Sequence, residues 1–73
     1  MRRDRLLRSQ IHARFVVTLL DGTGVSGLLV ACDESVIVLA NVAYLPRDAR
    51  AQPLSVDGQL YIERRQIAYL QAP

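Results

Sequence analysis

The sequence predicts a mainly β protein, with a short N-terminal α-helix and then a five-stranded, strongly bent antiparallel sheet that curls into a small barrel. Residues 15–42 alternate apolar side chains and are rich in β-branched residues, as half-buried strands are. Asp21-Gly22 and Asp33-Glu34-Ser35 interrupt this stretch as tight turns, which makes it a three-stranded meander. Gly27 lies inside the second strand, where a glycine marks a sharp bend or a close backbone approach.

The helix is expected over residues 4–13. Asp4 can cap its N-terminus, and no glycine or proline interrupts the segment. Leu7 and Ile11 lie one turn apart, so they form an apolar pair that docks on the sheet. His12 is expected to end the helix, where a cation is favourable.

The meander, residues 14–42, is expected to contain strands at 14–20, 24–32 and 36–42. Residues 43–58 contain two prolines and a polar run, and they are expected to form a long exposed loop, with frayed extensions of the strands as an open alternative. Residues 59–71 are expected to form a final strand pair, 59–63 and 66–71, joined at a tight corner by Arg64-Arg65.

With 73 residues, the chain is expected to be one domain, residues 1–73. A domain of this size buries only about 60% of the surface that its unfolded chain exposes, so it needs further stabilisation. The single cysteine, Cys32, excludes an internal disulfide, and a single histidine argues against structural zinc. Self-association is the means of stabilisation that remains, and the 51% apolar composition fits a surface that faces a neighbouring subunit.

Several classes of protein are excluded by what the sequence does not contain. No apolar run approaches the roughly 20 residues of a membrane span, and Leu6-Leu7 is too short for a signal peptide. A cytoplasmic location without membrane contact is therefore expected. There is no nucleophile–histidine–acid set, no cluster of metal ligands and no phosphate-binding glycine loop. We expect no enzyme activity, no cofactor, no metal and no small-molecule substrate.

All nine basic residues are arginines, and the net charge is +2. This bias fits a GC-rich genome, and it also suits contacts with the phosphates and bases of nucleic acid. The helix carries a secondary basic surface that could follow a nucleic-acid backbone, although a solvated helix face explains it equally. Its residues are Arg2, Arg3, Arg5 and Arg8.

The order of these elements resembles the Sm/LSm family, including its bacterial Hfq branch, as a divergent member. Residues 15–22, followed by Gly27, Leu29 and Asp33, are similar to the first family motif. The spacing over residues 33–41 resembles Hfq, and residues 62–67 are similar to the second motif. The resemblance covers nearly the whole chain and implies an Sm-like (SH3-like) barrel.

The resemblance implies a homo-oligomeric ring of six or seven subunits, joined through their fourth and fifth strands, that binds single-stranded RNA near the pore. The implied RNA-binding residues lie in the loop after the second strand and at the corner between the last two strands. They are Asp33, Glu34, Ser35, Arg64 and Arg65. We expect alanine at both arginines to abolish most binding.

This sequence departs from the Hfq pattern at the implied site. Ser35 stands where Hfq has a stacking aromatic, and Glu34 stands where it has glutamine. Loss of a stacking ring removes about 1–3 kcal/mol per base, and a carboxylate near the pore repels phosphate. These departures, together with Glu63, favour an alternative function, a ring-forming protein-interaction or assembly module that has lost RNA binding.

Overall fold

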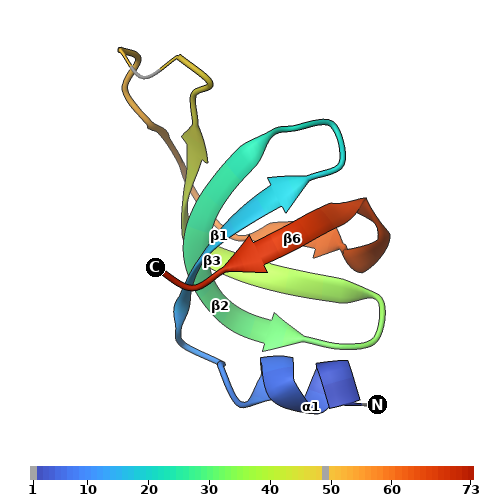
Figure 1. Ribbon diagram of the computed structural model, residues 1–73. Coiled ribbons are helices and arrows are strands. Elements are labelled where there is room, and N and C mark those ends of the chain that lie inside the picture. Colours follow the sequence, from blue (N-terminus) through green and yellow to red (C-terminus); the bar gives the residue numbers. More distant parts are fainter. Residues whose placement is uncertain (1, 49) are drawn as a thin grey trace.

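The computed structural model describes the backbone of residues 2–48 and 50–73 and the side chains of residues 5–48 and 50–73. A short helix is followed by strands that are all paired antiparallel, in agreement with the predicted class (Figure 1). The elements are α1 (Arg2–Arg8), β1 (Arg14–Leu19), β2 (Gly24–Cys32), β3 (Val36–Leu45), β4 (Leu54–Val56), β5 (Leu60–Glu63), the 3₁₀ turn η1 (Arg64–Gln66) and β6 (Ile67–Gln71).

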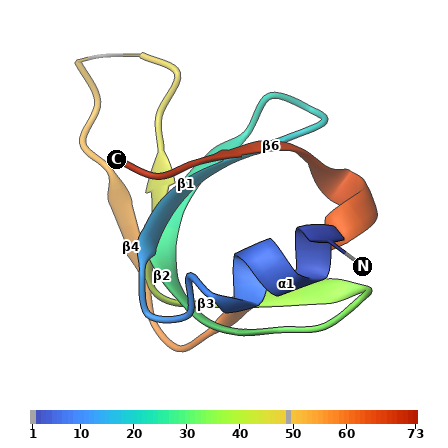
Figure 2. The ribbon, with the colours of Figure 1, turned by 60° about the horizontal axis from the view of Figure 1, so that its bottom comes forward.

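The sheet is curled but is not closed by hydrogen bonds. Its strand order is β4-β3-β2-β1-β6, and β5 also pairs with β3. Within the described part of the chain, β5 and β6 each pair with one other strand, so each keeps one free edge. Figure 2 shows the sheet curving round, with α1 beside its open end. The predicted strongly bent antiparallel sheet is confirmed, with one strand more than the five expected.

The antiparallel pairing of β2 with β3 is irregular at Gly27. The partners of Ser26 and Leu28 are Ala43 and Ala40, so β3 has one extra residue here. Such a bulge increases the local twist of a strand pair. A Cβ on Gly27 would lie 3.0 Å from the Leu39 Cβ and 3.2 Å from the Ala40 carbonyl oxygen. Glycine therefore allows the close approach that its position in the sequence predicted.

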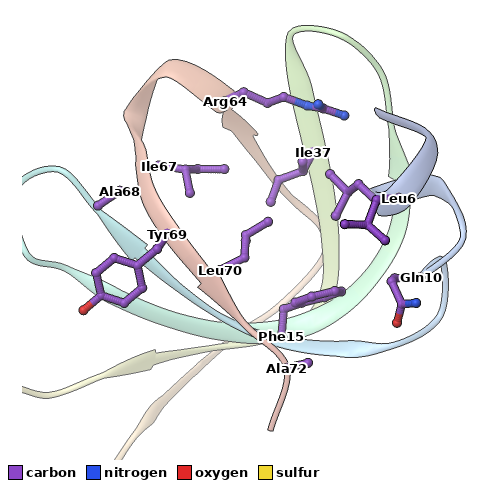
Figure 3. A pocket seen from close by; sticks show the side chains of 11 residues that line it. Leu6, Gln10, Phe15, Ile37, Arg64, Ile67, Ala68, Tyr69, Leu70 and Ala72 are labelled. Atoms are coloured by element: carbon purple, nitrogen blue, oxygen red, sulfur yellow. The ribbon is translucent and has the colours of Figure 1, made fainter. Parts of the chain in front are cut away.

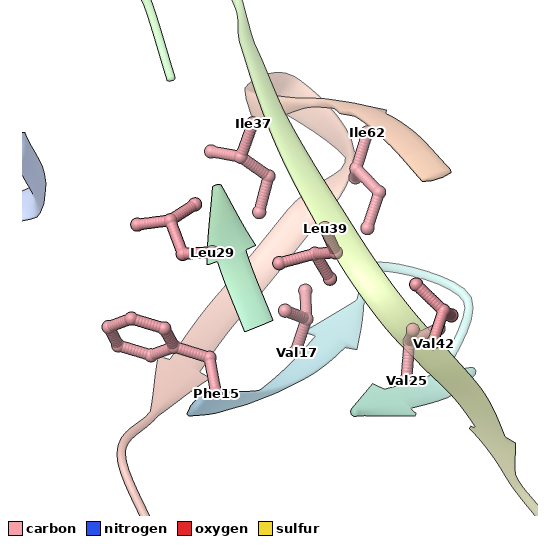
Figure 4. Packing of buried hydrophobic residues seen from close by; sticks show 8 residues of the cluster. All are labelled: Phe15, Val17, Val25, Leu29, Ile37, Leu39, Val42 and Ile62. Carbon is pink, nitrogen blue, oxygen red and sulfur yellow. The ribbon is translucent and has the colours of Figure 1, made fainter. Parts of the chain in front are cut away.

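The core lies inside the curled sheet and is built from alternate positions of the strands (Figure 4). Val17, Val25, Leu29 and Leu39 are completely buried. Partly buried side chains from α1, β5 and β6 pack around them, so every main element contributes to one core. The buried cluster consists of Phe15, Val17, Val25, Leu29, Ile37, Leu39, Val42 and Ile62.

The helix is shorter than predicted and begins earlier. It spans Arg2–Arg8, so Asp4 lies inside it and is not its N-cap. His12 is not a helix end, because it has a φ of 77° and its backbone N–H donates to the Leu29 carbonyl, 2.6 Å away. Pairing with β2 therefore satisfies the backbone where further helix was expected. Ile11 still packs against the core, as predicted.

Residues 43–58 are not one long loop. β3 continues to Leu45, and β4 returns alongside it, with Tyr44 opposite Leu54. Pro46 and Pro53 lie immediately outside the two strands, where their missing N–H groups do not interrupt the ladder. The connection projects away from the rest of the chain (Figure 1).

Candidate functional site: the corner between the β2–β3 loop and η1

The two segments that were expected to form one site do meet. Residue pairing between β3 and β5 runs up to Val36 opposite Glu63. The ladder then continues by one bond, because the Arg64 N–H donates to the Ser35 carbonyl at 2.8 Å. This bond holds the β2–β3 loop against η1. We call the resulting surface the corner, formed by residues 33–35 and 63–65.

Asp33 organises its own turn. Its Oδ1 accepts hydrogen bonds from the backbone N–H groups of Ser35, at 2.7 Å, and Val36, at 2.8 Å. The bond from Ser35 is the largest cause of the lowered pKa of Asp33, followed by that from Val36, and the positive charges of Arg64 and Arg8 add to them. This turn was predicted from the sequence, and it fixes the position of the loop.

The two adjacent arginines have different surroundings. Arg65 is 77% exposed, and its Nε lies 2.7 Å from Oε2 of Glu63, which is 57% exposed. Arg64 is half-buried and lies over the groove beside α1, where its side chain extends towards Leu6 (Figure 3). Of the two, Arg65 is the one presented to solvent.

The corner has no excess of positive charge. Glu34 and Ser35 are both exposed. Among the described residues, Arg8 is near enough to act on the Asp33 charge. The corner itself has three carboxylates and two guanidinium groups, and Arg8 of α1 adds a third positive charge, so the formal charges of these six described groups cancel. These groups are Asp33, Glu34 and Glu63, and Arg8, Arg64 and Arg65.

The secondary basic surface is described only in part. Arg5 and Arg8 lie on α1 with exposed side chains. The side chains of Arg2 and Arg3 lie outside the described residues. Arg8 links this surface to the corner through its effect on Asp33.

An open apolar groove of about 620 Å³, which the sequence did not predict, lies between α1 and the free edge of β6 (Figure 3). Ile67 and Leu70 form its wall on β6, and Phe15 and Ile37 form its floor, while Leu6 of α1 remains 69% exposed. Leu6 and Leu7 were the feature of the sequence that could have indicated this groove. They belong to a helix that leaves one of them in solvent.

Tyr61 on β5 and Tyr69 on β6 are the large apolar side chains of the two free sheet edges. They are 68% and 56% exposed. Their neighbours Ile62 and Leu70 belong to the core or pack against it, so both tyrosines lie on the outer face of the sheet. From the sequence, these two tyrosines were expected to pack at strand or subunit contacts, and side chains at a subunit contact are exposed in a single chain.

The remaining reactive side chains form no second site among the described residues. Cys32 is half-buried and packs beside the core. No group of three or more histidine, cysteine, aspartate or glutamate residues could hold a metal ion in the part of the chain that is described. No described helix is both long and apolar enough to cross a membrane.

No protein-family model matches the sequence, and no curated protein sequence matches it significantly. Solved structures do match. A heptameric archaeal Sm protein has a TM-score of 0.80 at 14% identity, over 94% of this chain and 97% of that chain. The SmAP1 heptamer of P. aerophilum has a TM-score of 0.80 at 14% identity, over 96% and 90%. A chain of the NatC complex bound to CoA has a TM-score of 0.75 at 20% identity, over 92% and 83%. The likeness confirms the fold that the sequence motifs indicated: this chain has an Sm-like fold.

Proposed function

We propose that this chain forms a homo-oligomeric ring of six or seven copies that binds single-stranded RNA at the corner. It would act as a cytoplasmic binding protein without catalysis. The observation that carries the proposal is the bond between the Arg64 N–H and the Ser35 carbonyl, because it joins the two implied RNA-binding segments. Arg65, exposed beside this bond, is then the residue that meets phosphate.

The free edges of β5 and β6 support the ring. Each edge has unpaired backbone groups that can hydrogen-bond to a strand of another copy. Pairing of β5 in one copy with β6 in the next is heterologous, and it closes into a ring where the rotation allows. Tyr61 and the groove beside β6 supply apolar surface for the same contact. Two of the solved structures with this fold are heptamers.

The RNA part of the proposal is tested with labelled single-stranded oligonucleotides at low and moderate salt. If Arg65 of each copy binds one phosphate, the slope of log affinity against log salt should become shallower in Arg65→Ala, by about 0.7 for each phosphate that is no longer bound. Arg50→Ala is the matched control, because it removes an exposed arginine from the projecting loop. Equal binding by the two variants would contradict the assignment of Arg65.

A second candidate function is an assembly module that binds protein instead of RNA. The cancelling charges at the corner favour it, because phosphate gains little from a site without excess positive charge. One solved structure with this fold is a chain of the NatC complex. Native mass spectrometry separates the candidates: an intact ring that binds no oligonucleotide at low salt would support the assembly module.

A further inference from the structure

The free edges of β5 and β6 each carry one exposed tyrosine on the outer face of the sheet. Resting on the proposed ring, we infer that these two tyrosines set the register between neighbouring copies: Tyr61 of one copy lies directly opposite Tyr69 of the next and packs against it. The partner at this surface is a second copy of this chain. The pair fixes how far β5 of one copy slides along β6 of the other.

The first step concerns the direction of the two strands. β5 runs into η1 and β6 runs out of it, so the two strands point in opposite directions (Figure 1). Neighbouring copies of the proposed ring are related by one sixth or one seventh of a turn, which is too small a rotation to reverse a strand. β5 of one copy and β6 of the next are therefore antiparallel, and their free edges supply the backbone groups for the ladder.

The second step concerns the faces of these strands. Ile62 of β5 is opposite a buried residue of β3, and Leu70 of β6 is opposite a buried residue of β1. Both therefore face the core, whereas Tyr61 and Tyr69, one position away, face outwards. A slip by one residue would place core-facing side chains of one copy beside outward-facing side chains of the next. The registers that remain keep the outward faces of the two strands together.

The third step selects one of these registers. In the part of β6 that pairs regularly with β1, the outward-facing positions are Tyr69 and Gln71. If Tyr61 were opposite Gln71, the first residue of β5 would extend past the end of β6. If Tyr61 is opposite Tyr69, all four residues of β5 lie along β6. The register with the two tyrosines opposite each other therefore forms the longer ladder.

The fourth step concerns what the pair contributes. Tyr61 is 68% exposed and Tyr69 is 56% exposed in the single chain. Directly opposite side chains of an antiparallel pair have Cβ atoms about 4.5–5.5 Å apart, so the two rings can pack together and leave water. The same register sets Glu63 of one copy beside the start of β6 in the next. The corners of neighbouring copies then adjoin, as one RNA strand that binds several copies requires.

Disulfide trapping tests the register. In a Cys32→Ala background, which removes the natural thiol, mild oxidation of Tyr61→Cys/Tyr69→Cys should join neighbouring copies. A disulfide needs Cβ atoms about 3.5–4.5 Å apart, which directly opposite positions can reach. We expect covalent multimers up to the size of the ring on a non-reducing gel. Tyr61→Cys/Gln71→Cys is the matched control, and it should give about tenfold less product, because diagonal positions are about 7–8 Å apart. Equal or stronger cross-linking in this control overturns the inference.

Leucine variants test the contact without an oxidant. Tyr61→Leu and Tyr69→Leu keep an apolar side chain, and each should weaken assembly about two- to tenfold per contact, because the aromatic pair is lost. The double variant should assemble about as well as either single variant, since the second substitution removes a contact that is already lost. Native mass spectrometry over a range of protomer concentrations measures this. Effects that multiply in the double variant overturn the inference. An assembled parent chain without the 61–69 cross-link overturns the inference alone, whereas a parent chain that stays monomeric at every concentration overturns the ring as well.

Discussion

Gly27 lies at an irregularity in the pairing of β2 with β3, and replacing it with alanine measures how tightly the two strands approach there. The new Cβ would lie 3.0 Å from the Leu39 Cβ and 3.2 Å from the Ala40 carbonyl oxygen. Neither atom is the end of a flexible side chain, so the backbone must move. Overpacking of this kind destabilises by about 1–3 kcal/mol. Alanine also restricts the unfolded chain, which returns about 0.4–1 kcal/mol. The two effects together should lower the free energy of unfolding by about 1.3 kcal/mol when each is taken at the middle of its range.

Gly24→Ala is the control for Gly27→Ala, because both positions lie in β2 and neither glycine has a positive φ. A Cβ on Gly24 would lie 3.4 Å from the Leu45 Cβ, an ordinary contact. Because no overpacking offsets the restriction of the unfolded chain, the free energy of unfolding of Gly24→Ala should be unchanged or higher by up to about 1 kcal/mol. Urea unfolding should be measured at several matched protomer concentrations, because the proposed assembly would add to apparent stability. Equal destabilisation of the two variants would refute the role assigned to the close approach at Gly27.

Two further predictions concern the turn at Asp33 and the free edge of β5. The pKa of Asp33 is lowered in the folded chain, so the unfolded chain binds more protons as pH falls. The stability that this carboxylate contributes is present above about pH 4. It should be lost at lower pH. As pH falls, the free energy of unfolding should decline less steeply in Asp33→Asn than in the parent protein, and an equally steep decline would contradict this. Asp21→Asn is the comparison, because the pKa of Asp21 is lowered by a similar turn. Tyr61→Glu should reduce the oligomer to monomers in native mass spectrometry, because a charge on the free edge disfavours pairing with another copy. Tyr44→Glu, on β3 between Val25 of β2 and Leu54 of β4, should leave the oligomer intact, and assembly by both variants would exclude β5 from the contact.

The sequence could predict the features that are local. The alternation of apolar residues in a strand and the turn residues that end it both come from adjacent positions in the sequence. The limits of β2 therefore agree with prediction to the residue. The Asp33 turn was predictable because its donors, Ser35 and Val36, follow it directly. Gly27 was predictable as a bend, although its neighbours Leu39 and Ala40 were not, since they belong to another strand.

The features that the sequence could not predict depend on pairing between distant segments. His12 leaves the helical conformation because the Leu29 carbonyl accepts its N–H. β4 exists because β3 continues far enough to pair with it, with Asn41 at a φ of 51° beside the bulge. No local pattern distinguishes such a segment from a loop. The prolines that suggested a loop mark its ends instead.

The difference between Arg64 and Arg65 has a consequence for how the proposed ring would hold RNA. One arginine lies over the groove, and the other is exposed but shared with Glu63, so each copy offers little attraction alone. An exposed ion pair of this kind stabilises the folded chain by at most about 1 kcal/mol. Useful affinity must then come from repetition, because each added contact on one RNA strand is intramolecular after the first. RNA binding and assembly should therefore disappear together in Tyr61→Glu, even though Tyr61 lies on the outer face of the sheet and outside the corner. A monomeric Tyr61→Glu variant that kept full affinity would show that a single corner suffices and that repetition is not the source of binding.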